Sequence, residues 1–182
     1  MDSEYNNYPH DTSDEETLYV CLVHNLDQEI LIQRSFLRVL DEELSVLISA
    51  SMDGMEETNS QKELLIYKTK ENTFSRQAIL DQVKKALGLQ KDQQITLSLC
   101  ESRVSDEILS GKLRDCRQIL INLMEQVQKN NQRNQDAIRA ALENVHGSLQ
   151  FLKAMLFPAA NYQKTGQYNQ NNAQGAFISQ EG

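Results

Sequence analysis

The sequence predicts an all-α protein, and three observations lead to this prediction. The chain of 182 residues has no tryptophan, two prolines and seven glycines, and its body is rich in good helix formers such as Leu, Gln, Glu, Lys and Ala. Three stretches place apolar residues three and four positions apart, which puts them on one face of a helix. The last stretch is by far the longest. We therefore expect an elongated antiparallel bundle of three to four helices, dominated by one very long C-terminal helix.

The first predicted helix carries a regular stripe of mostly apolar residues. Asp41, Glu42 and Glu43 run beside this stripe, and since adjacent helix positions face different directions, we interpret them as a solvated face. The pattern breaks at Ser51–Gly54, where Asp53 is a candidate N-cap or turn residue. The stripe residues are Leu26, Ile30, Gln33, Leu37, Leu40, Leu44 and Leu47.

The second predicted helix runs from about Glu56 to Leu87. Gly88 follows the basic pair Lys84 and Lys85, which is the expected chemistry of a helix end. Its stripe is diluted by cations that we assign to solvated faces, namely Lys62, Lys68, Lys70 and Arg76.

A connection follows, up to about Ser105. Ile95, Leu97 and Leu99 alternate with polar residues there, as they would in a strand. A lone strand leaves its backbone groups unpaired, so we favour a short helix or an ordered loop.

The third predicted helix extends from about Val104 to Leu156, and Pro158 ends it. Its mean apolar spacing is about 3.6, which is typical of a straight helix. The first two helices cover this stripe incompletely, and its distal part then keeps an apolar strip of the kind that marks a protein-binding site or an oligomer interface. The stripe comprises Leu109, Leu113, Cys116, Leu120, Leu123, Val127, Asn131, Asn134, Ile138, Leu142, Val145, Leu149, Leu152 and Leu156.

The two ends of the chain differ from its body. Residues 1–18 form an acidic leader with few apolar side chains, and residues 159–182 form an Asn/Gln-rich tail. Neither segment buries enough apolar surface to offset the entropy of ordering, so both are expected to be disordered or flexible. Residues 19–158 remain as a single helical domain.

Charge and cysteine content exclude several classes of function. A net charge of -8 argues against nucleic-acid binding, which needs a basic face. No apolar stretch is long enough to span a membrane, and the acidic start is unlike a secretory signal, so we expect a cytoplasmic protein. Cys21, Cys100 and Cys116 are widely spaced and are interpreted as small buried hydrophobes rather than disulfide or zinc ligands.

Catalytic motifs are not found in the sequence. His10, His24 and His146 lie far apart, and the chain has no HExxH, phosphate loop or nucleophile elbow. We therefore predict no enzyme activity, no catalytic residues, no metal site and no cofactor.

Two motifs near the C-terminus connect the chain with a known family. They are Asn131-Gln132-Arg133-Asn134 on the long helix, followed by its leucines, and the tail motif Tyr162-Gln163-Lys164-Thr165-Gly166-Gln167 after Pro158. In these features the chain resembles the FlgN family of cytosolic chaperones, which hold hook-filament junction proteins before flagellar type III export. The chain departs from the family pattern in having Gln135, where glycine is common.

The resemblance implies a set of functional residues. A groove on the distal third helix would take the C-terminal amphipathic segment of a junction protein as a helix, and Tyr162 and Gly166 would contact the flagellar export gate. Asn131 and Asn134 would hydrogen-bond the client backbone or fix its register; a polar layer inside the bundle is the other role open to them. The predicted client-binding residues are Asn131, Asn134, Ile138, Leu142, Val145, Leu149 and Leu152.

Two other functions fit the same pattern. The long stripe could pair with its own copy in a structural coiled-coil homodimer or tether. Small acidic helical chaperones also share composition without sharing clients, so a different type III secreted substrate is the second alternative. The export-chaperone hypothesis predicts a monomer or weak dimer that binds its client.

Overall fold

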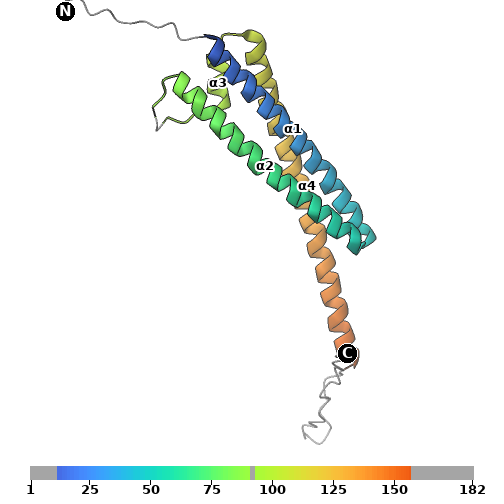
Figure 1. Cartoon of the computed structure of the whole chain (residues 1–182). Helices are drawn as coiled ribbons and strands as arrows, with labels where there is room; N and C mark the ends of the chain where they lie inside the picture. Colours follow the sequence, from blue (N-terminus) through green and yellow to red (C-terminus); the bar gives the residue numbers. More distant parts are fainter. Residues whose placement is uncertain (1–11, 91–92, 157–182) are drawn as a thin grey trace, which may run out of the picture. The chain divides into compact units, whose positions relative to one another are not determined.

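The computed structural model describes residues 12–90 and 93–156, and all regular secondary structure in these ranges is α-helical. The predicted all-α class and the very long C-terminal helix are both confirmed. The chain divides into two units between Gln135 and Asp136, a point inside the range 19–158 that the sequence predicts as one domain. The helices, shown in Figure 1, are α1 (Thr12–Ser49), α2 (Met52–Ala86), α3 (Leu97–Arg103) and α4 (Glu107–Leu156).

Helices α1 and α2 form an antiparallel hairpin with a very short turn (Figure 1). Ala50 adopts a left-handed φ of 52° at the reversal. Ser51 caps α2, because its hydroxyl oxygen accepts a hydrogen bond from the Gly54 amide at 3.2 Å. The predicted break is confirmed. Neither role expected for Asp53, N-cap or turn residue, is found, because Asp53 lies inside the first turn of α2.

The two helices approach closely beside this turn. A Cβ atom on Gly54 would lie 2.8 Å from one methyl of Val46 and 3.0 Å from the other. Because valine is stiff about χ1, it could not easily move aside. Glycine at this position therefore permits the tight start of the hairpin.

Two buried glutamates on α1 set the register of the hairpin. Glu29 is 6% exposed and pairs with Arg76 at 3.4 Å, and Glu43 is 3% exposed and pairs with Lys62 at 2.5 Å. The glutamates are fourteen residues apart on α1, and their cations are fourteen residues apart on α2. The predictions that Glu43, Lys62 and Arg76 lie on solvated faces were therefore wrong, because each acid and base covers the other.

Amide side chains extend the polar contact around Glu29. Asn25 Nδ2 donates to Asn72 Oδ1 at 2.8 Å, and Asn72 Nδ2 donates to Glu29 Oε2 at 2.8 Å. Gln33 Nε2 donates to the other Glu29 oxygen at 2.8 Å. Hydrogen bonds to both oxygens offset the cost of burying this carboxylate.

The hydrophobic core of the first unit lies where the start of α1 meets α3, the end of α2 and the start of α4. Helix α3 confirms the preference for a short helix in the connection; it is capped by Thr96 and linked to α4 by the Glu101–Arg117 ion pair at 2.6 Å. The buried residues of this core are Tyr19, Leu22, Leu26, Ile30, Val83, Cys100, Leu109, Leu113, Cys116 and Leu120.

Two of the three cysteines lie in that core. Burial raises the pKa of the Cys100 thiol to about 11. Burial, together with the Asp27 carboxylate 3.6 Å away, raises the pKa of the Cys116 thiol to about 11. Both therefore remain protonated at neutral pH. The prediction was wrong for Cys21, which is exposed on α1.

Residues close in sequence determine where α2 ends and where α4 begins. Gly88 has a φ of 64°, and its N–H bonds to the Lys85 carbonyl, as predicted for the end of α2. Helix α4 begins at Glu107, three residues later than predicted, because the Asp106 carboxylate accepts from the Ile108 amide at 2.7 Å. It ends at Leu156, and Pro158 lies outside the described residues.

The predicted leader is shorter than residues 1–18. Helix α1 begins at Thr12, and one helical turn links Tyr19 to Glu15, whose carboxylate accepts from the tyrosine hydroxyl at 3.4 Å. Burial of Tyr19 and Leu22 in the core supports this start. The leader residues 1–11 and the predicted tail, residues 159–182, lie outside the described ranges.

Replacing Lys62 with Met tests the buried ion pair. The change leaves the Glu43 carboxylate buried without its cation, so we expect the free energy of unfolding in urea to fall by about 2 kcal/mol, below the full effect for a completely buried pair because Lys62 is partly exposed. The exposed Lys68→Met is the matched control and should change stability by less than about 0.5 kcal/mol. Adding Glu43→Gln to Lys62→Met should restore part of the loss, because the neutral side chain removes the buried charge while its amide oxygen can still accept from the Asn134 amide. Equal stability of the two single variants would contradict this account.

Candidate functional site

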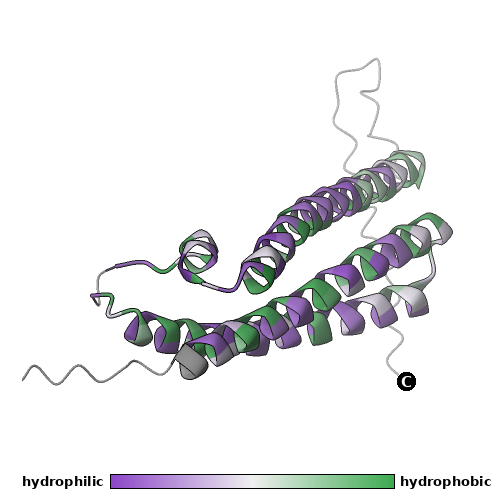
Figure 2. Ribbon diagram, turned by 90° about the horizontal axis from the view of Figure 1, so that it is seen from above, coloured by the Kyte–Doolittle hydropathy of each residue, from purple (hydrophilic) through white to green (hydrophobic). Residues whose placement is uncertain are grey.

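The distal part of α4, residues 136–156 in the second unit, carries an exposed apolar stripe. Leu142 is 64% exposed, Val145 57%, Leu149 59% and Leu152 50%, and Leu156 is also exposed. Ile138, at the start of the stripe, is partly buried. Figure 2 shows the polar middle of α4 in purple and hydrophobic residues in green returning towards its end. We call Ile138, Leu142, Val145, Leu149, Leu152 and Leu156 the distal stripe.

The distal stripe has its own spacing. Its steps alternate strictly between four and three, which is a seven-residue repeat, whereas the whole helix averages about 3.6. A seven-residue repeat of large apolar residues is the pattern with which a helix packs along a second helix. A run of exposed Leu and Val side chains on one face also marks an interaction surface.

Asn131 and Asn134 have different surroundings. Asn134 is 1% exposed, and its Nδ2 donates to the Leu40 carbonyl at 2.6 Å and to Glu43 Oε2 at 3.0 Å. Its Oδ1 has no hydrogen-bond partner among the described residues. Asn134 therefore forms a polar layer inside the bundle, the second role that the sequence left open, whereas Asn131 is exposed.

Two further contacts hold the same turn of α4 to α1. The Arg133 guanidinium lies 2.9 Å from Asp41 Oδ1, and the Asn130 amide donates to the same oxygen at 3.2 Å. These side chains are exposed or partly exposed, so each contact contributes little free energy. They nevertheless align α4 with α1 in the same way as the hydrogen bond between Asn134 and Glu43.

A hollow that the sequence did not predict opens between α1, α2 and α4 in the first unit. Its volume is about 600 Å³, and Asn131 lies at its edge. Ile66 and Met124 are 47% and 58% exposed, so part of its wall is open to solvent. In the sequence, the lining pairs Phe36 and Leu40 on α1 and Met124 and Val127 on α4 show only ordinary helical spacing. The apolar lining residues are Phe36, Leu40, Ile66, Met124 and Val127.

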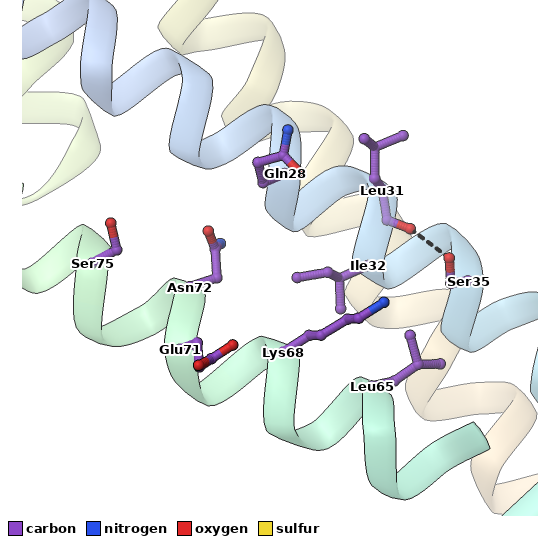
Figure 3. A pocket seen from close by; sticks show the side chains of 9 residues that line it. All are labelled: Gln28, Leu31, Ile32, Ser35, Leu65, Lys68, Glu71, Asn72 and Ser75. Atoms are coloured by element: carbon purple, nitrogen blue, oxygen red, sulfur yellow. Dashed lines mark hydrogen bonds between the residues drawn. The ribbon is translucent and has the colours of Figure 1, made fainter. Parts of the chain in front are cut away.

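A second hollow lies between α1 and α2 and has a different character. Figure 3 shows the residues that line it, which are Lys68, Glu71, Asn72 and Ser75 of α2 and Gln28, Leu31, Ile32 and Ser35 of α1, with Leu65 at one end. Its volume is about 480 Å³. The hydrogen bond drawn there, from the Ser35 hydroxyl to the Leu31 carbonyl, is an ordinary helical contact at 2.9 Å. Nothing in this lining pairs a nucleophile with a base.

Across residues 12–90 and 93–156, no three His, Cys, Asp or Glu side chains come together as a metal site would require. His24 and His146 are exposed on different helices, and the His146 ring contacts the Gln150 amide at 2.9 Å. None of the helices in these ranges is long and apolar enough to cross a membrane.

The predicted site residues therefore fall into three groups: exposed, buried or partly buried, and outside the described residues. It exposes Leu142, Val145, Leu149 and Leu152 on one face, together with Asn131, which lies earlier on α4. It buries Asn134 against α1, and partly buries Ile138. Tyr162 and Gly166 lie outside the described residues, so the predicted contact with the export gate remains a prediction.

Comparison with known proteins identifies the family. The sequence model of a family described as FlgN protein matches residues 21–170, well over half of the chain. The match includes the two asparagines, the distal stripe and the Tyr162 motif. No curated protein and no solved structure matches the chain. The resemblance seen in the motifs is therefore confirmed, and the chain belongs to the FlgN family of flagellar export chaperones.

Proposed function

We propose that this chaperone holds the C-terminal amphipathic segment of hook-filament junction proteins on the distal stripe and delivers them, in the cytoplasm, to the flagellar type III export apparatus. Family membership supports a flagellar chaperone role in general. We place the client site on the distal stripe because its large apolar side chains are exposed, namely Leu142, Val145, Leu149 and Leu152. A helix with one apolar face would bury this stripe in the manner of helix-in-groove recognition.

The energetics suit a reversible complex. Fully burying a large aliphatic side chain contributes about 1.5 to 3 kcal/mol, and the exposed stripe residues have roughly half of that still to gain, about 1 kcal/mol each. Five such residues, with an equal contribution from the client, give about 10 kcal/mol before costs. Association and ordering of the client cost about 4 to 15 kcal/mol. At the lower end of that cost, about 6 kcal/mol remains in favour of binding, which corresponds to a weak complex that can release its client.

The asparagines have separate parts in this proposal. Asn131 is exposed just before the distal stripe begins and is available to a client backbone. Asn134 already donates both of its hydrogen bonds to α1, so we do not include it among the client contacts. Its part is to hold the first half of α4 in register.

The seven-residue repeat also favours one competing function, a homodimer through the same stripe. The two are separated by light scattering of the purified protein followed by titration with a junction-protein segment. We expect a monomer or weak dimer that binds the segment. A chaperone for a different secreted substrate would be monomeric as well and would bind that substrate in preference.

Leu149→Asp tests the stripe directly. A carboxylate in the middle of the stripe would have to be buried on binding, so we expect affinity for the junction-protein segment to fall at least about a hundredfold. The helical circular dichroism signal should change little, because Leu149 is 59% exposed in the free chain. Isothermal titration calorimetry measures the affinity, and Leu142→Asp should behave in the same way.

Phe151→Asp is the matched control. Phe151 is 65% exposed on the same segment of α4. Because Phe151 lies two residues after Leu149, its side chain points away from the stripe. We expect it to bind the client as the wild type does. Unchanged affinity of Leu149→Asp, or an equal loss in both variants, would count against the distal stripe as the binding face.

Tyr162→Ala separates delivery from binding. If the tail motif serves the export gate while α4 holds the client, this variant should bind the junction-protein segment normally and still reduce the amount of junction protein exported by cells. The export assay is compared with Tyr168→Ala, a tyrosine in the same tail outside the motif. Equal export by Tyr162→Ala and the wild type would remove the tail motif from the proposal.

A further inference from the structure

A row of basic side chains borders the distal stripe on one side. Arg139, His146 and Lys153 are spaced seven residues apart, and each directly follows a stripe residue. Because seven residues are almost two helical turns, the three side chains line one edge of the stripe. The other edge is uncharged and consists of Ala141, Ser148 and Met155. The two edges of the stripe are therefore electrically different.

The basic edge stands out in a chain whose net charge is -8. The acids of this segment, Asp136 and Glu143, lie one step further round the helix, away from the stripe. Arg139 contacts Asp136 at 3.2 Å, but both side chains are more than half exposed, so the pair is weak and can exchange for another partner. Arg139 and Lys153 are cationic side chains, and His146 lies between them on the same edge.

A second copy of this chain does not complement that edge. In a parallel pair, the basic edge would face the uncharged edge of the partner and gain no ion pairs. In an antiparallel pair, basic edges would face each other and repel. The stripe is thus apolar enough to pair with a helix, while its edges disfavour pairing with itself.

We propose that the basic edge selects a client helix whose apolar face is bordered by acidic side chains at seven-residue spacing. This inference rests on the proposed function, since it names the chemistry of the client at the same stripe. Acidic residues facing Arg139 and Lys153 complete ion pairs on binding, and they also steer the client in the correct orientation. The apolar contacts give the binding energy, and the charged edge distinguishes one amphipathic helix from another.

Three synthetic peptides with one common apolar face test the proposal on the full-length protein. They carry Glu, Gln or Lys at the positions that border this face on both sides, so either orientation is sampled. Two exposed ion pairs predict that the Glu peptide binds about threefold to fivefold more tightly than the Gln peptide at low salt. The Lys peptide should bind more weakly than both, and the differences should vanish at about 0.5 M salt.

Reversing the edge provides the decisive variant. Arg139→Glu combined with Lys153→Glu should reverse the order, so that the Lys peptide binds most tightly. A charge-matched control, Lys68→Glu combined with Lys129→Glu, makes the same change in net charge at exposed positions outside the distal stripe and should keep the wild-type order.

The outcomes distinguish this inference from the proposed function. If the three peptides bind equally and Leu149→Asp abolishes their binding, the stripe is the site and the charge selection is wrong. If Leu149→Asp binds them as the wild type does, or if no peptide binds, both proposals are overturned. If the control variant also reversed the order of the peptide affinities, selection by the basic edge would be overturned, because the change in net charge alone would explain the reversal.

Discussion

The structure depends on the burial of Glu43 at the point where three helices meet. Its carboxylate receives the Lys62 ammonium from α2 and the Asn134 amide from α4. A charge that is 3% exposed would be strongly destabilising without these partners, so α1, α2 and α4 can pack there in one register only. The Glu29–Arg76 pair repeats the same register along the hairpin, and the hydrophobic core then forms between α3 and the adjoining ends of the other helices.

The same constraint gives α4 two parts with different roles. Up to Asn134, the apolar residues of its stripe are buried or partly buried and belong to the fold. From Ile138 onwards the apolar spacing changes to a strict seven-residue repeat, and the large side chains are mostly exposed. Free energy for folding comes from the first part, which leaves the second part free for binding. The modest gain on covering the distal stripe, and its one basic edge, suit selective and reversible binding better than permanent assembly.

The spacing of apolar residues in the sequence predicted most of the helices and their apolar faces. Among the predictions that failed are those for charged residues that form ion pairs between helices. The stripes of α1 and α4 and the end of α2 at Gly88 could be predicted because they depend on residues close in sequence. Glu43, Lys62 and Arg76 were predicted to be solvated because charged residues usually are; their burial depends on partners 19 and 47 residues away. The incomplete cover of the long stripe also predicted that Leu142 and Leu149 are exposed, and the structure exposes them while it buries Leu113 and Leu120 of the same helix.

Hydrogen exchange compares the folded and the client-binding parts of α4 in one sample. In the free chain, amides of residues 138–156 should exchange far faster than those of the buried core around Leu22 and Leu113, since all of these residues except Ile138 are exposed. Adding the C-terminal segment of a junction protein should slow exchange at 138–156 and leave the core unchanged. Strong protection of 138–156 in the free chain, or client-induced protection confined to α1 and α2, would contradict the account.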